Sequence, residues 1–128
     1  MEHRGNRPIL IVEDDPIVSD TFARLLRLDG FHVLTAPDAI AGLRAMAEAD
    51  PAAVLVDLRM PVVDGVAMVR RIREQENGCQ RPVAIITGDY LLDDTIIESL
   101  SALNAHLYFK PVWLEELLTI VQTLLAKS

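Results

Sequence analysis

Five short apolar runs alternate along this chain with longer segments whose apolar residues recur at helical spacing. This pattern constrains the fold more than any other feature, because strands that alternate with helices pair in parallel and place the helices on the faces of the sheet. We therefore predict an α/β fold, a doubly wound parallel sheet of five strands with five helices. The predicted strands are residues 9–12, 32–35, 53–56 leading into Asp57, 83–87 and 106–109. The predicted helices are 16–28, 38 to about 50, one from about 64, 93–103 and 112–125.

The helical segments carry their own start signals. Pro16 is a good first helical residue, Asp15 and Asp38 suit N-cap positions, and Asp64 can cap the helix that follows it. Apolar residues at helical spacing predict which face packs on the sheet. The side chains expected to point inward are Phe22, Leu25, Leu26, Ala39, Leu43, Met46, Ala47, Met68, Val69, Ile72, Leu114, Leu117, Leu118, Val121 and Leu125, with Arg70, Arg71 and Arg73 on the solvent side.

Composition and charge exclude several classes of protein. The 128 residues suffice for one domain with an ordinary core, which we place at 8–128 behind a flexible tail at 1–7. A net charge of −7 without a broad Lys or Arg cluster argues against direct nucleic-acid binding. No apolar stretch is long enough to span a bilayer and the polar opening lacks a signal-peptide core, so we expect a cytoplasmic chain with no membrane segment. The lone Cys79 can form no internal disulfide.

Polar groups follow four of the predicted strands at the point where each strand ends. Asp57 ends the apolar run 53–56, and the acids 13–15 follow the first strand. Thr87 ends the fourth strand and Lys110 follows the fifth. The carboxyl ends of parallel strands lie on one edge of a sheet, where open α/β folds place their sites. The sequence therefore predicts acids, a hydroxyl and an ammonium in one place.

The acids suit a hard cation, although some of these residues also fit simpler roles. Glu13, Asp14 and Asp15 are consecutive, so we expect only one or two of them to face Asp57. Carboxylates packed together repel one another unless a cation neutralises them, and oxygen ligands with open water positions suit Mg²⁺. Asp15 also fits an N-cap. Lys110 can reach a carboxylate, an anionic ligand or only solvent.

In combination, these residues resemble the receiver domains of two-component response regulators. The motifs that carry the resemblance are the segments 11–16, 57–65 and 86–88 and the pair Lys110-Pro111, and the match runs from Ile9 to about Leu125. Each motif is weak alone, but the four in order fit five strand–helix units. The resemblance implies a flavodoxin-like sheet with strand order 2-1-3-4-5.

The resemblance also implies a metal site. Asp14, Asp57 and the backbone carbonyl of Arg59 would bind Mg²⁺, and Glu13 would contact the ion mainly through water. Asp57 would be the phosphoacceptor, which takes a phosphoryl group from the phosphohistidine of a sensor histidine kinase or phosphotransfer protein.

Two further residues would contact the phosphoryl group in such a domain. Thr87 would hydrogen-bond one phosphoryl oxygen and move when the group arrives, while Lys110 would pair with another oxygen. Arg59 and Asp89 each lie two positions beyond a site residue, so we expect them to rim the cleft and regulate the lifetime of the phosphate. The domain would catalyse only its own phosphorylation and dephosphorylation.

The chain departs from the family pattern at two positions. Receivers usually carry an aromatic residue three positions before the lysine, and here that position is Leu107. Either Leu107 performs the coupling, or Tyr108 or His106 substitutes for the aromatic residue. Gly88 stands where a small residue, commonly Ala, is usual.

Signal output is expected through the face formed by the helix 93–103, the strand 106–109 and the helix 112–125, as a homodimer or a partner contact. The apolar residues concentrated there are Tyr90, Leu91, Leu92, Leu107, Tyr108 and Trp113.

Two other functions stay open from the sequence. One is a Mg²⁺-dependent phosphohydrolase with an Asp nucleophile, although such enzymes want an acid where Arg59 stands. The other is a receiver that no longer switches and serves as a docking module, although no site residue is missing.

Overall fold

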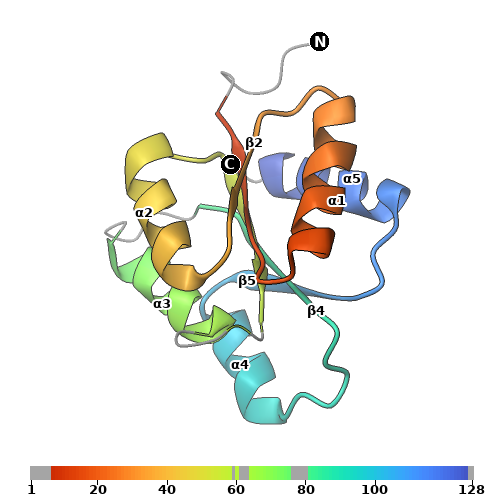
Figure 1. Ribbon diagram of the computed structural model, residues 1–128. Coiled ribbons are helices and arrows are strands. Elements are labelled where there is room, and N and C mark those ends of the chain that lie inside the picture. The colour runs from red at the N-terminus through yellow and green to blue at the C-terminus, as the bar shows by residue number, and fades with distance from the viewer. Residues whose placement is uncertain (1–6, 59, 61–63, 76–80, 127–128) are drawn as a thin grey trace.

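A computed structural model describes residues 7–58, 60, 64–75 and 81–126, so Arg59 and Cys79 lie outside the described residues. Within these ranges, five strands alternate with five helices (Figure 1). The strands are β1 (Ile9–Val12), β2 (Val33–Ala36), β3 (Ala53–Asp57), β4 (Val83–Thr87) and β5 (Ala105–Phe109). The helices are α1 (Pro16–Leu28), α2 (Ala39–Ala49), α3 (Gly65–Gln75), α4 (Asp94–Ala102) and α5 (Leu114–Ala126).

All four strand pairs are parallel, and the strand order is β2-β1-β3-β4-β5, which confirms the predicted topology. From β1 the chain first adds β2 on one side, and then crosses over to add β3, β4 and β5 on the other side. Helices α1 and α5 cover one face of the sheet, while α2, α3 and α4 lie on the other (Figure 1). The central strands β1, β3 and β4 are buried throughout, whereas the edge strand β2 exposes Leu34 and Thr35.

Alternate residues of each strand supply two separate cores, because successive side chains in a strand point to opposite faces. Ile9 and Ile11 pack in the core under α1 and α5. Leu10 and Val12 pack in the other core, under α2, α3 and α4. Each of these four side chains is at most 1% exposed, and full burial of such a side chain stabilises a fold by roughly 2 kcal/mol.

Aspartate caps start the helices where the sequence predicted them. The carboxylates of Asp15, Asp38 and Asp64 accept hydrogen bonds from the backbone amides of Ile17, Ala41 and Ala67. Asp93 caps α4 in the same way through Ile96. These bonds satisfy amides that the first helical turn leaves without a partner inside the helix. The N-cap reading of Asp15 is therefore confirmed.

Some of the predicted inward side chains were assigned wrongly. Ala47 is exposed, and the buried positions of α2 are Ala39, Gly42 and Met46. A Cβ atom built on Gly42 would lie 2.7 Å from Cε of Met68 and 2.8 Å from Cγ2 of Val12. The glycine therefore lets α2 approach the sheet and α3 closely.

Helix α5 starts two residues later than predicted, at Leu114, and this leucine is 44% exposed in the first turn. The buried stripe of α5 instead includes Ile120 and Leu124, which the sequence analysis did not select. The sequence pattern alone did not show how far the connection after β5 extends before the helix begins.

Arg73 is not on the solvent side as predicted. Its guanidinium donates hydrogen bonds to the carbonyls of Leu103, Arg81 and Asn104 at 2.8, 2.7 and 3.3 Å. A planar fork of five donors can serve several carbonyls at once, so this side chain ties the end of α3 to the turn between α4 and β5.

Two further arginines gather around Asp50, at the end of α2. Nη2 of Arg81 lies 2.9 Å and Nη2 of Arg7 3.3 Å from Oδ1 of Asp50. The side-chain hydrogen bond from Arg81, more than the charge of Arg7, holds the pKa of Asp50 below its ordinary value. Arg7 also donates to the carbonyl of Pro51. The predicted division of the chain between residues 7 and 8 stays a prediction.

Among the described helices, none has the length and apolar character that crossing a membrane requires.

We expect Gly42→Ala to destabilise the fold by about 1–2 kcal/mol, because the clash with Val12 outweighs the roughly 1 kcal/mol of helix propensity that alanine adds. Urea unfolding measures the difference. The matched control is Ala47→Gly on the exposed face, which should cost about 1 kcal/mol from propensity alone. A Gly42→Ala protein that is more stable than the native chain would contradict the close packing.

Candidate functional site

The strands deliver the predicted polar groups to a single edge of the sheet. Asp57 is the last residue of β3, and its register partner in β4 is Ile86, the residue before Thr87. Thr87 is in turn the partner of Phe109, and the backbone amide of Lys110 donates to the carbonyl of Thr87 at 2.8 Å. Parallel pairing thus places residues that are far apart in the sequence next to one another at the carboxyl ends of adjacent strands.

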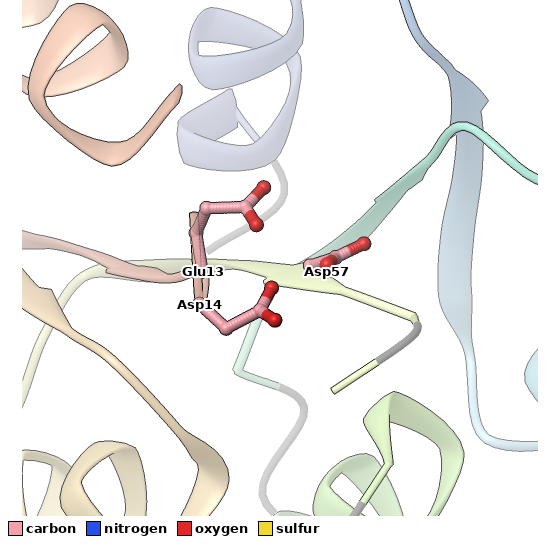
Figure 2. Close-up of side chains that lie close together, drawn as sticks. All are labelled: Glu13, Asp14 and Asp57. Atoms are coloured by element: carbon pink, nitrogen blue, oxygen red, sulfur yellow. The ribbon is translucent and has the colours of Figure 1, made fainter. Parts of the chain in front are cut away.

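Three carboxylates meet at this edge. Oxygen atoms of Glu13, Asp14 and Asp57 all lie within 4.8 Å of one another. Glu13 and Asp14 extend from the end of β1, and Asp57 from the end of β3 (Figure 2). Glu13 and Asp57 are 5% and 7% exposed, while Asp14 is open to solvent. Two of the three consecutive acids thus face Asp57, and the third, Asp15, caps α1.

Lys110 offsets part of the negative charge. Its ammonium donates to Oε1 of Glu13 at 2.8 Å and lies 3.9 Å from Oδ1 of Asp57. The other oxygen of Glu13 accepts the amide of Asp15 at 3.2 Å. Three carboxylates face a single ammonium, so Lys110 alone cannot neutralise the cluster. The arrangement favours a divalent cation with oxygen ligands.

Thr87 is fully buried, and its hydroxyl oxygen accepts the backbone amide of Asp89 at 3.1 Å. A hydroxyl that accepts one hydrogen bond keeps its own proton for donation to another acceptor. The carboxylate of Asp89 accepts the amide of Leu91 at 3.0 Å, which folds the segment after β4 into a turn. The edge therefore offers a hydroxyl donor and an ammonium beside the acids. The acids can bind a cation, and the hydroxyl and the ammonium can then bind an anion that contacts this cation.

Gly65 is a site residue that appeared in the sequence only as the last residue of the segment 57–65, with no role of its own. Its amide donates to the carbonyl of Leu58 at 2.9 Å. A Cβ atom at this position would lie 2.9 Å from the carbonyl oxygen of Asp57 and from Cα of Leu58. The glycine thus lets α3 begin directly against the backbone that carries Asp57. An Asp-Gly pair soon after a strand-end acid was the available signal.

The other residues predicted for the site are Arg59 and the candidate coupling residues on β5. Arg59, predicted to supply a carbonyl ligand and to rim the cleft, lies outside the described residues. Leu107, Tyr108 and His106 are half-buried on β5. Phe109, which the sequence analysis treated only as part of the strand, is 40% exposed and stacks on Tyr90.

Comparison with known proteins agrees with this geometry. The family model described as response regulator receiver domain matches residues 9–122. The transcriptional regulatory protein PrrA of Mycobacterium tuberculosis is 36% identical over 119 residues, which cover 93% of this chain and 50% of the relative. RpaA of Synechocystis, a DNA-binding dual master transcriptional regulator, is 33% identical over 120 residues, or 94% of this chain and 49% of its own length. The chain thus spans about half the length of these curated relatives.

A solved response regulator receiver domain protein of Clostridium thermocellum is similar to the whole fold. It superposes with a TM-score of 0.81 at 28% identity and covers 94% of both chains. Sequence matches along nearly the whole chain, the strand order 2-1-3-4-5 and the acids gathered at the strand ends lead to one conclusion: this chain belongs to the family of response regulator receiver domains of two-component signalling.

Proposed function

We propose that Asp57 is the phosphoacceptor of this receiver domain. The observation that carries the proposal is the position of its carboxylate, which a buried strand places within 4.8 Å of the oxygens of Glu13 and Asp14 and 3.9 Å from the Lys110 ammonium. A structural acid would gain nothing from two further acids beside it. The donor is the phosphohistidine of a sensor histidine kinase or of a phosphotransfer protein.

The reaction transfers a phosphoryl group between two side chains. A carboxylate oxygen of Asp57 attacks the phosphorus while the bond from phosphorus to the donor's imidazole nitrogen breaks. The carboxylate needs no deprotonation, so this chain's contribution is positioning and charge neutralisation. Lys110 pairs with one phosphoryl oxygen, and the Thr87 hydroxyl donates its proton to another. Water later hydrolyses the aspartyl phosphate, so the domain acts as a signalling switch and not as an enzyme with an external substrate.

The residues present fit Mg²⁺. Asp14 and Asp57 would hold the ion directly with the backbone carbonyl of Arg59, and Glu13 through water. Carboxylate, carbonyl and water oxygens form the ligand set that Mg²⁺ accepts, and bound Mg²⁺ supplies positive charge to the phosphoryl oxygens. Because Lys110 contacts Glu13 more closely than Asp57, we propose that it exchanges Glu13 for a phosphoryl oxygen during the reaction.

We also propose that the surface of α4, β5 and α5 transmits the phosphorylated state, through a homodimer or a partner. Tyr90 and Leu91, before α4, and Trp113, before α5, are 62%, 92% and 69% exposed, and exposed apolar groups often mark partner surfaces. The relatives named as transcriptional regulators are about twice as long as the matched segment, and we propose that this chain itself does not bind DNA directly. A cytoplasmic location and the division into residues 1–7 and 8–128 stay predictions.

Two alternatives are less well supported. A phosphohydrolase would need an acid two positions after the nucleophile, where this chain has Arg59. A docking module without a switch would not need the Glu13, Asp14, Asp57 and Lys110 groups together.

We expect Asp57→Asn to abolish phosphoryl uptake from a small phosphodonor such as acetyl phosphate in the presence of Mg²⁺. The fold should persist, since the substitution removes one repelling charge from the cluster. Mass spectrometry measures the uptake. Glu48→Gln, an exposed acid on α2, serves as the control and should retain stoichiometric labelling. Label on Asp57→Asn would refute the assignment, and native protein that consumes the donor without keeping label would favour the hydrolase.

We expect Mg²⁺ to stabilise the native chain against thermal unfolding, because it relieves repulsion among the acids. At a concentration about ten times the dissociation constant, the gain is roughly 1.4 kcal/mol, or several degrees in Tm. Asp14→Asn should lose most of this shift. Lys110→Ala should melt lower without Mg²⁺ and gain more from it, since the ion would then replace the missing ammonium. Equal shifts in native and Asp14→Asn proteins would count against the site.

A further inference from the structure

Two aromatic side chains stack on each other at the surface beside the site. The ring centroids of Tyr90, in the connection between β4 and α4, and Phe109, at the end of β5, are 5.4 Å apart with an angle of 18° between the ring planes. Tyr90 is 62% and Phe109 40% exposed, so neither ring belongs to the two cores. The pair joins two segments whose positions are set by the same residue, Thr87.

Thr87 is bonded to both segments. Its carbonyl accepts the amide of Lys110, next to Phe109, and its hydroxyl oxygen accepts the amide of Asp89, next to Tyr90. Phe109 is also the register partner of Thr87 in the sheet. The segment after β4 is therefore held at one point by the Thr87 hydroxyl and at the adjoining residue by the Phe109 ring.

We propose that the Tyr90–Phe109 stack is a restraint that holds the Thr87 hydroxyl in its resting position and so sets the conformational cost of phosphorylation. The proposal rests on the function proposed above for Asp57 and Thr87. When a phosphoryl oxygen draws the hydroxyl, the bond from the Asp89 amide is given up, and Tyr90 leaves Phe109 together with the segment that Asp89 anchors. Phe109 thus acts as a positioning residue through Tyr90 and Asp89, without touching the reacting atoms.

The restraint makes a prediction for the free protein, with no phosphoryl group present. Phe109→Leu removes the stack and should raise the hydrogen-exchange rate of the Asp89 amide between about twofold and tenfold, the range that corresponds to the usual strength of an aromatic pair. Phe109→Tyr keeps the ring and should restore the native rate. Leu28→Ala, which shortens an exposed apolar side chain at the end of α1 and away from the stack, is the control and should leave the rate unchanged.

Beryllofluoride is a mimic of the phosphoryl group, and its binding in the presence of Mg²⁺ tests whether the stack sets the conformational cost of phosphorylation. If the stack opposes the movement of Thr87, Phe109→Leu should bind beryllofluoride between about twofold and tenfold more tightly than the native chain, because part of the conformational cost is already removed. A residue with a merely structural role would weaken binding or leave it unchanged when replaced. The NMR signals of both rings in the native protein should shift when beryllofluoride binds.

The outcomes separate the two proposals. An Asp89 amide that exchanges equally in the native and Phe109→Leu proteins overturns the restraint, whatever happens at Asp57. Equal or weaker beryllofluoride binding by Phe109→Leu overturns it as well. A native protein that binds no beryllofluoride, while Phe109→Leu still accelerates exchange at Asp89, contradicts the function proposed for Asp57 and leaves the link between the stack and Thr87 established.

Discussion

Repulsion among three carboxylates at one edge of the sheet is the constraint on which this site depends. Pairing of β1 with β3 holds the backbone segments that carry Glu13, Asp14 and Asp57 side by side, so the three carboxylates start from neighbouring strand ends. Lys110 offsets part of this charge through Glu13, and the remainder creates affinity for a cation and, through that cation, for a phosphoryl group. The repulsion among the three acids is therefore also the source of the cation affinity that the proposed reaction needs.

The sheet can hold such a cluster because both of its faces are covered by well-packed cores. Side chains from alternate positions of β1 enter different cores, so the strand ends beside the site are supported from two sides. Close backbone approach adds to this support. Gly65 lets α3 begin against the carbonyl of Asp57, and Gly42 brings α2 against Val12, the residue before Glu13. Both glycines act by omitting a side chain, because that space is filled by the backbone of Asp57 and Leu58 at Gly65 and by the side chains of Met68 and Val12 at Gly42.

Thr87 connects the acids to the outer surface. It lies buried at the end of β4, with Lys110 bonded to its carbonyl and Asp89 bonded to its hydroxyl. One residue thus links the group proposed to neutralise the phosphate and the segment that leads to α4. Leu107 is half-buried and packs against the core under α2, α3 and α4, whereas Phe109 is exposed and stacks on Tyr90 outside that core. If the proposed restraint holds, a movement of Thr87 reaches the surface through these stacked rings.

The sequence alone predicts the element order, the strands β1, β3 and β4 and the caps at Asp15, Asp38 and Asp64, because these follow from local periodicity and local hydrogen bonding. It also identified the residues at the strand ends, while the strand order came from the family resemblance. Three sets of contacts could not be predicted from the sequence: Lys110 lies closer to Glu13 than to Asp57, Arg73 donates to three carbonyls, and Tyr90 stacks on Phe109. These contacts join residues distant in sequence, and their partners depend on how the helices and connections pack, which no local pattern encodes.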